Sequence, residues 1–196
     1  MNRPGEPAIR LDGVTKSFGT LKVLDDVPLD VQEGTAFCLM GRSGTGKSVT
    51  LKHIIGLMKP DSGKVLVHGK DVAALKRSEL SEVRRTMGFL FQNSALFDSI
   101  TVGENVAFPL RRHTDWDDAK SREMAMAKLA DVGLEKDFDK MPSDLSGGMK
   151  KRAGLARAMA LDPDILLVDE PSAGLDPITS DEIDELLVAL KKKGTT

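Results

Sequence analysis

The sequence predicts an α/β fold in which helices alternate with the strands of a mainly parallel sheet. Apolar, strand-like runs alternate along the chain with stretches of helical period. Residues 165–168 form a continuous apolar run, which is typical of a strand buried on both faces. The chain has 196 residues, of which 40% are hydrophobic and 30% charged, so we expect one or at most two small globular domains.

Three strands are expected in the first part of the chain, because these stretches are rich in Val, Leu and Ile and are punctuated by glycines. They are residues 9–16, 21–31 and 35–40. After Gly46 the apolar positions follow a helical spacing, and the Pro-Asp-Ser-Gly segment at 60–63 ends that helix. Further strands are expected at 64–68 and 87–91.

The region from about 94 to 142 has no convincing strand, so we interpret it as a helical insertion. Thr101 and Glu104 have the spacing of a capping box, and the helix that starts there is expected to end at or before Pro109. Three more helices are expected at 115–132, 148–161 and 183–190. The chain is therefore interpreted as one domain over 1–196, with a helical subdomain at about 94–160.

Composition excludes several classes of protein. The chain has 28 Lys and Arg against 30 Asp and Glu, which argues against a general nucleic-acid binder, so no nucleic-acid partner is expected. Its single cysteine, Cys38, rules out an internal disulfide and is expected to be a buried, inert thiol. No apolar run approaches the roughly 18 residues of a membrane span, and the first residues show no signal-peptide pattern. Any membrane role is therefore expected to depend on partners.

Residues 41–48 read G-R-S-G-T-G-K-S and match the phosphate-binding pattern G-x-x-x-x-G-K-S/T in full. Its glycines let the backbone point several N–H groups at phosphate oxygens, and the following helix adds its positive end. Lys47 is expected to reach the β- and γ-phosphates of ATP, and the Ser48 hydroxyl to bind Mg²⁺. The predicted ATP-binding residues here are Gly41, Arg42, Ser43, Gly44, Thr45, Gly46, Lys47, Ser48 and Val49.

Two acidic residues follow the buried strand at 165–168. Asp169 lies where a carboxylate can join the Mg²⁺ shell, and Glu170 can orient or deprotonate the attacking water. Alone, such a pair would more simply be a surface feature at a strand end. Together with the loop at 41–48 it predicts a nucleotide-hydrolysing site, with Glu170 and Lys47 as catalytic residues.

The segment Leu-Ser-Gly-Gly at 145–148 precedes that strand, Gln92 follows the strand at 87–91, and Gly-Leu-Asp at 174–176 follows Glu170. With these motifs the chain resembles the ATP-binding subunit of ABC transporters, from about Ile9 to its last residue. The resemblance implies an N-terminal antiparallel β subdomain, and an enzyme that hydrolyses ATP with Mg²⁺.

In that family two copies meet head to tail and enclose two ATPs. The resemblance therefore implies that Ser146, Gly147, Gly148 and Asp176 act on the ATP held by the second copy. Gln92 is implied as a catalytic, Mg²⁺-binding residue that links the site to the membrane-facing surface. Phe18 stands where the family places an aromatic ring under adenine, although a core Phe is an alternative interpretation.

Two departures from the family pattern matter. The fifth signature residue is Met149 instead of Gln. The family's histidine, on the strand after Glu170, has no counterpart, since the histidines here are His53, His68 and His113. We therefore expect a C-terminally truncated fragment that lacks the last core strand, shows a gap between the strands bearing Met40 and Val168, and hydrolyses ATP poorly.

Segments 91–97, 141–149 and 176–179 resemble the Mla-type subgroup, which is associated with MCE-domain lipid-binding proteins and sometimes named for toluene tolerance. This implies an integral-membrane permease and an MCE-domain protein as partners, phospholipid traffic between bacterial membranes, and a location at the cytoplasmic face of the inner membrane. Leu96, Phe97 and Phe108 are expected to dock the permease, with core packing as the alternative.

Other interpretations stay open. No residue identifies a lipid, so another ABC importer or exporter is possible. A soluble ABC ATPase of DNA repair or translation would generally carry a coiled-coil insertion or two ATPase units, for which the chain has no room. Intact Lys47, Asp169 and Glu170 argue against a non-enzymatic regulatory module. The basic run at Lys150, Lys151 and Arg152 is interpreted as a solvated helix face.

Overall fold

The computed structural model describes residues 6–196 and divides into two compact units. The first unit contains the chain up to Arg84 together with Lys191–Thr196, and the second contains Arg85–Leu190. The absence of a signal-peptide pattern was inferred for residues that lie largely outside the described part.

The first unit is built around a four-stranded antiparallel sheet with the strand order β2-β1-β3-β4. Its elements are β1 (Ile9–Phe18), β2 (Leu21–Val31), α1 (Lys47–Ile54), β3 (Ser62–Val67), β4 (Lys70–Asp71) and α2 (Arg77–Arg85). Ile9 pairs with Val31 on one side and with Val67 on the other, and all three side chains are buried. A Cβ on Gly63 would lie 2.3 Å from the Gly13 carbonyl oxygen, so only glycine allows this close crossing of β1 and β3.

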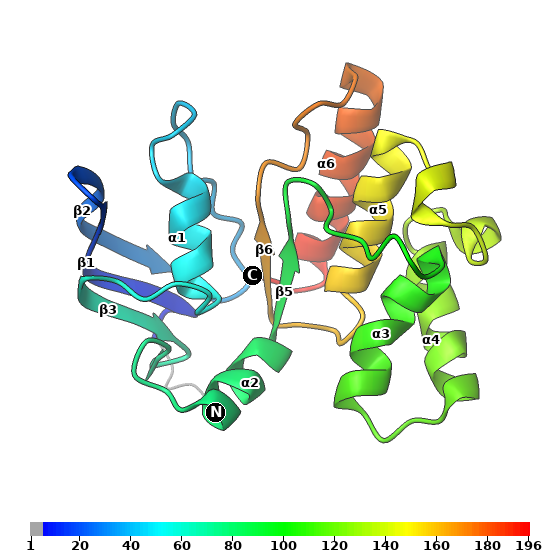
Figure 1. Cartoon of the computed structure of the whole chain (residues 1–196), viewed down its shortest axis with the longest axis horizontal. Coiled ribbons are helices and arrows are strands. Elements are labelled where there is room, and N and C mark those ends of the chain that lie inside the picture. Colours follow the sequence, from blue (N-terminus) through cyan, green and yellow to red (C-terminus); the bar gives the residue numbers. More distant parts are fainter. Residues whose placement is uncertain (1–5) are drawn as a thin grey trace. The chain divides into compact units, whose positions relative to one another are not determined.

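The second unit contains a parallel pair of strands covered by helices (Figure 1). Its elements are β5 (Met87–Leu90), α3 (Val102–His113), α4 (Asp118–Ala130), 3-10 turns η1 (Glu135–Asp137) and η2 (Pro142–Asp144), α5 (Gly147–Ala158), β6 (Ile165–Val168) and α6 (Pro177–Lys192). Met87 pairs with Ile165 and Leu90 with Val168. The antiparallel sheet of the first unit and this parallel pair confirm the predicted α/β class.

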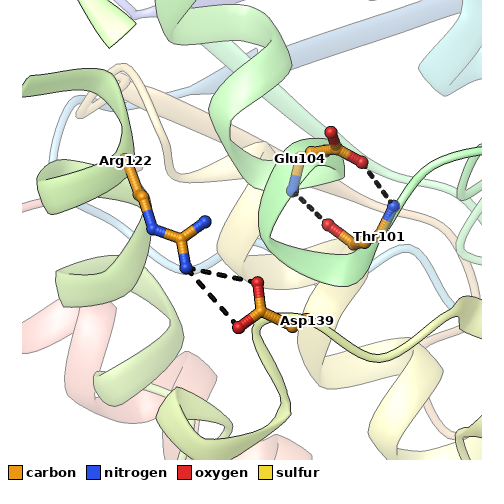
Figure 2. Close-up of polar contacts among 4 residues, drawn as sticks. All are labelled: Thr101, Glu104, Arg122 and Asp139. Atoms are coloured by element: carbon orange, nitrogen blue, oxygen red, sulfur yellow. Dashed lines mark hydrogen bonds and ion pairs between the residues drawn. The ribbon is translucent and has the colours of Figure 1, made fainter. Parts of the chain in front are cut away.

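Helix α3 begins at a tightly anchored N-terminus. The Thr101 side chain accepts a hydrogen bond from the Glu104 N–H at 3.2 Å, and the Glu104 carboxylate accepts one from the Thr101 N–H at 2.8 Å (Figure 2). This is the capping box that the sequence predicted. The first two helical N–H groups, those of Val102 and Gly103, donate to the carbonyls of Lys140 and Phe138, so the first turn of α3 has its donors satisfied.

Residues 135–140 are held against α3 and α4. Arg122 of α4 lies 4.0 Å from the centroid of the Phe138 ring and pairs with Asp139 at 3.2 Å, as Figure 2 shows for the ion pair. A Cβ on Gly103 would lie 2.2 Å from a Phe138 ring carbon. Glycine at the start of α3 therefore allows the Phe138 ring to pack directly against the helix backbone.

Two predicted elements differ from the structure. Residues 35–40 belong to neither sheet, and Phe37 and Met40 are 52% and 90% exposed. Apolar composition alone cannot make a strand, because a strand also needs neighbours for its backbone groups, and this segment pairs with no described strand. The expected gap between the strands bearing Met40 and Val168 stays a prediction, because residues 35–40 form no strand. Cys38 in this segment is exposed, so the expectation of a buried thiol was wrong.

Helix α3 continues past Pro109 to His113, so the predicted end at or before the proline was also wrong. An interior proline costs a helix about 3 kcal/mol. Leu110 is fully buried in the helical core, and burial of such a side chain contributes about 1.5–3 kcal/mol. Packing of the next turn thus offsets the loss of one backbone hydrogen bond. Helix α2, which the sequence patterns did not predict, has a single buried residue, Val83.

Candidate functional site

The phosphate-binding motif forms a turn that leads into α1 in the first unit. Gly46 is the N-cap residue of α1 with φ +95°, and Gly44 has φ +82°, a region that L side chains rarely adopt. No side chain caps this N-terminus, and no acidic residue lies in its first turn. The positive end of α1 is therefore left for an anionic ligand, as the motif predicted.

Lys47 turns back onto its own loop. Its ammonium donates hydrogen bonds to the carbonyls of Gly41 and Arg42, both at 3.0 Å. The Thr45 hydroxyl also donates to the Arg42 carbonyl, at 2.8 Å. The Lys47 ammonium is thus held at the loop of residues 41–46. There it can exchange its two carbonyl partners for phosphate oxygens. The Ser48 side chain follows on the first turn of α1 and is half-buried.

Phe18 lies at the end of β1 with 45% of its surface exposed, so it is not the core residue of the alternative interpretation. The Lys16 ammonium lies 5.8 Å from the ring centroid. The Asp61 carboxylate fixes this end of the strand. It accepts hydrogen bonds from the Lys16 ammonium at 2.6 Å and from the Ser17 N–H at 2.7 Å. The hydrogen bond from Lys16 is the main reason that the pKa of Asp61 is lowered. An exposed, positioned ring is what stacking on a base requires.

The catalytic residues predicted in the second unit meet at the carboxyl ends of β5 and β6. The Gln92 amide donates to the Glu170 carboxylate at 2.9 Å. Asp169 is 6% exposed, and its N–H extends the ladder to the Leu90 carbonyl at 2.9 Å. Glu170 has φ +47°, a left-handed backbone that is uncommon outside glycine. The parallel pairing of two strands therefore brings together residues 78 positions apart in sequence.

Lys151 belongs to this group, although the sequence was interpreted as placing it on a solvated helix face. That interpretation was wrong, since Lys151 is 4% exposed. Its ammonium donates to the carbonyl of Gln92 and, at 3.1 Å, to the carbonyl of Glu170. Burial lowers the pKa of Lys151, and the nearby Asp169 and Glu170 carboxylates oppose that shift. Helical periodicity could have indicated the burial of Lys151, because Lys151 lies on the same buried side of α5 as Gly148, Gly154 and Leu155.

The signature segment forms the N-terminus of α5. Ser146 is exposed and caps the helix by accepting a hydrogen bond from the Met149 N–H at 3.3 Å. Gly147 is also exposed, whereas Gly148 is buried against α6. A Cβ on Gly148 would lie 2.2 Å from Thr179 Cγ2, so a larger residue would separate the two helices.

Asp176 precedes α6 and caps it. Its carboxylate accepts hydrogen bonds from the Thr179 hydroxyl at 2.6 Å and the Thr179 N–H at 3.1 Å. These bonds, the hydroxyl's first, lower the pKa of the Asp176 carboxyl. Because Thr179 also contacts Gly148, the N-termini of α5 and α6 lie side by side and present Ser146 and Asp176 together.

The predicted site residues therefore form three groups. Phe18 and residues 41–49 lie in the first unit, while the Gln92–Glu170 pair with Asp169, and the Ser146–Gly148 end with Asp176, lie in the second. Among residues 6–196 there is no cluster of three or more His, Cys, Asp or Glu side chains that could hold a metal. The hydroxyl, amide and carboxylate oxygens of Ser48, Gln92 and Asp169 are instead the donor types that Mg²⁺ takes, usually with water and phosphate.

A comparison with protein families matches residues 24–173 to the ABC transporter family model. The chain belongs to the ABC transporter family. The match includes the phosphate-binding loop, Gln92, the 145–148 signature and the Asp169–Glu170 pair, so the predicted resemblance is confirmed.

Curated relatives of two kinds are similar to the chain. The "Probable ribonucleotide transport ATP-binding protein mkl" of Mycobacterium leprae is 48% identical over 92% of this chain and 52% of the relative. The "Intermembrane phospholipid transport system ATP-binding protein MlaF" of Haemophilus influenzae is 44% identical over 94% of this chain and 70% of the relative. The chain spans about half the length of the mkl relatives that it matches.

Solved structures of ABC cassettes share the fold. The ATP-binding cassette MJ0796, in a dimeric post-hydrolysis state bound to ADP and Pi, aligns with a TM-score of 0.88 at 35% identity. That alignment covers 96% of this chain and 85% of the cassette. A search of the described helices for one that is long and apolar enough to cross a membrane found none.

Proposed function

We propose that this chain is the ATP-binding and ATP-hydrolysing part of an ABC transporter. The observation that carries the proposal is the Gln92–Glu170 hydrogen bond of 2.9 Å at the carboxyl ends of two parallel strands, beside the buried Asp169. A carboxylate held by an amide at this edge suits a general base for water. ATP hydrolysis also requires a phosphate-binding site, and the uncapped N-terminus of α1 with its glycine loop provides one.

Each residue has a distinct role in this proposal. Lys47 and the loop at 41–46 bind the phosphates, and the exposed Phe18 ring stacks on adenine. Ser48, Gln92 and Asp169 would supply oxygen ligands to Mg²⁺, whose charge would offset that of the phosphates. Glu170 accepts a proton from the attacking water, and Gln92 orients the Glu170 carboxylate through the observed hydrogen bond.

A second copy of the chain is proposed to complete the site. The exposed Ser146 and Gly147, and Gly148 behind them, would present the N-terminal end of α5 to the ATP of the partner copy. Asp176 lies beside this end and would cross the same interface. The dimeric state of the similar MJ0796 cassette supports this arrangement.

A membrane permease is the proposed partner of the second unit. Phe97 and Phe108 are 46% and 48% exposed, and their ring centroids lie 5.1 Å apart. Leu96 is partly buried against the helical core, so the exposed surface consists of the two rings. This aromatic patch would place the chain at the cytoplasmic face of a bacterial inner membrane through its permease.

Phospholipid is the proposed cargo, with an MCE-domain protein as a further partner. The MlaF relatives, named for intermembrane phospholipid transport, support this choice. The mkl relatives are named for probable ribonucleotide transport and are 47–48% identical, so ribonucleotide is the second candidate. The proposed ATPase chemistry is the same for both cargoes.

Reconstitution of the full-length protein with the permease encoded beside it tests the function. ATP hydrolysis and movement of a labelled phospholipid between vesicles are measured with wild-type protein and with Glu170→Gln. ATP-dependent phospholipid transfer that Glu170→Gln abolishes is the expected result. ATP-dependent ribonucleotide uptake without phospholipid transfer would select the second cargo, and absence of ATP hydrolysis in the assembled wild type would contradict the proposal altogether.

A further inference from the structure

A buried lysine bridges the backbones of the two proposed catalytic residues. The Lys151 ammonium donates to the carbonyls of Gln92 and Glu170, and the side chains of those two residues bond to one another. The three residues therefore form a closed ring of hydrogen bonds across the carboxyl ends of β5 and β6. Only 4% of the Lys151 surface is exposed, so water does not compete freely for these carbonyls.

Other residues of α5 contact residues 94 and 95, which follow Gln92 in the chain. Arg157 donates to the carbonyls of Ser94 and Ala95, each at 2.7 Å. A Cβ on Gly154 would lie 3.0 Å from the Ser94 Cβ, so the segment packs closely against the helix. Ser94 and Ala95 have φ values of +60° and +50°, a conformation that needs such external support. Helix α5 thus fixes residues 92–95 through contacts at 151, 154 and 157.

The choice of a lysine here calls for a physical reason. A buried cation costs free energy unless it is hydrogen-bonded, and a helix needs no charge for core packing. Beyond the last backbone bond between the strands, from the Asp169 N–H to the Leu90 carbonyl, the Gln92–Glu170 side-chain contact also joins these two ends, and a substrate or water could replace that contact. A cation tethered to α5 keeps both backbones in place when that contact changes.

We propose that Lys151 is a positioning residue that sets the geometry of Gln92 and Glu170 for ATP hydrolysis. This inference rests on the proposed function. Misplacement of a reacting group by about 1 Å can lower a rate on the order of a hundredfold. The two carbonyls that Lys151 binds belong to the proposed catalytic residues Gln92 and Glu170, so its effect is expected in turnover and not in ATP affinity.

The test uses the full-length protein assembled with its permease. Lys151→Met retains length but removes both donated bonds, and Lys151→Arg retains a cation with several donors. Lys151→Ala leaves room for a water on the two carbonyls, so it is expected to fold even if Lys151→Met does not. Arg152→Met is the matched control, since it removes a cation-to-carbonyl bond of α5 to Val132, away from Gln92 and Glu170.

We expect the Met and Ala variants to lower kcat about tenfold to a hundredfold, with KM for ATP within about twofold of wild type. The Arg variant should keep at least about half of the wild-type kcat, and the Arg152→Met control should lower the melting temperature without lowering kcat. In a Glu170→Gln background, single-turnover rates should be nearly the same with and without the Lys151 substitution, because positioning acts through the carboxylate.

Three results would overturn the inference: wild-type kcat in either uncharged variant, an equal loss from Lys151→Met in the Glu170→Gln background, or an Arg variant as slow as the Met variant. Each of these leaves the proposed function intact if the wild type hydrolyses ATP and Glu170→Gln does not. An inactive wild-type complex would instead contradict the proposed function itself.

Discussion

At the scale of single residues, Glu170 combines two unusual features. Its backbone adopts φ +47°, and its carboxylate accepts a hydrogen bond from the Gln92 amide at 2.9 Å. A left-handed conformation at a residue other than glycine costs about 1–3 kcal/mol and persists only where the surroundings enforce it. Here the hydrogen bond from Lys151 to the Glu170 carbonyl and the side-chain bond to Gln92 supply that support.

Glu170→Gln should therefore abolish turnover without loss of ATP binding. The amide keeps the size of the side chain but cannot accept a proton from water, and loss of a general base costs about 10²–10⁴ in rate. Steady-state hydrolysis and ATP binding are measured in the full-length transporter, with the exposed Glu182→Gln on α6 as control. Near-normal turnover by Glu170→Gln would remove Glu170 from the catalytic role.

Lys47→Ala should remove stabilisation by ATP but not folding. In the absence of nucleotide, the ammonium donates to two carbonyls of its own half-exposed loop, so its loss should change the apo melting temperature little. ATP at a hundredfold excess over its Kd stabilises a binding-competent protein by about 2.7 kcal/mol. Melting temperatures with and without ATP are compared with Lys52→Ala on the same helix. Full stabilisation of Lys47→Ala by ATP would show that the loop does not bind phosphate.

At the scale of elements, the N-terminus of α3 depends on its cap more than on nearby ion pairs. Thr101 and Glu104 satisfy each other's backbone N–H groups in a half-buried setting. The Arg122–Asp139 pair lies beside them in Figure 2, but its side chains are 53% and 78% exposed. Exposed pairs contribute about 0–1 kcal/mol, whereas a lost cap costs about 0.5–2 kcal/mol.

Thr101→Ala should thus lower the free energy of unfolding by about 1 kcal/mol, and Asp139→Asn by less. The Asp139 substitution removes the ion pair but leaves the contact of Arg122 with the Phe138 ring. Urea denaturation of the two variants gives the comparison directly. A larger loss for Asp139→Asn than for Thr101→Ala would show that the ion pair, and not the cap, secures this end of the helix.

At the scale of the whole molecule, the helical part of the second unit has one large core and a small exposed aromatic patch. Residues of α3, α4 and α5 bury a shared set of apolar side chains, among them Val106, Leu129 and Leu155. Phe97 and Phe108 lie outside this set, half-exposed and in contact with each other. Their substitution should therefore affect a partner more than the fold.

Phe97→Asp should uncouple ATP hydrolysis from transport without lowering ATP affinity. A charge on the patch opposes burial against an apolar permease surface, while the nucleotide-binding loop in the first unit is unchanged. Transport, hydrolysis and ATP affinity are measured in the reconstituted complex, with Leu57→Asp as an exposed apolar control in the first unit. Loss of ATP binding by Phe97→Asp would favour the core interpretation of this ring.

Local patterns in the sequence predicted most elements, the phosphate-binding motif and the acidic pair after β6, whereas the family resemblance implied the roles of Gln92, Phe18, the 146–148 segment and Asp176. The strand at 165–168 was placed at its observed bounds, and Gly133 ends the α4 segment with φ +69°, as glycine at such a position allows. The motif at 41–48 and the acids after β6 could be identified because their chemistry depends on residues adjacent in the chain. Backbone turns, caps and periodic apolar faces are local properties, so a single sequence contains them.

Long-range contacts explain what the sequence did not predict. Residues 35–40 have the composition of a strand, but strand formation depends on partners far away in the chain. Helix α3 passes Pro109 because burial of Leu110 offsets a local cost. The sequence predicted Lys151 to be part of a solvated basic run. In the structure its ammonium binds the carbonyls of Gln92, 59 residues before it, and of Glu170, 19 residues after it. Such positions are set by the summed free energy of contacts between distant segments, which no local pattern records.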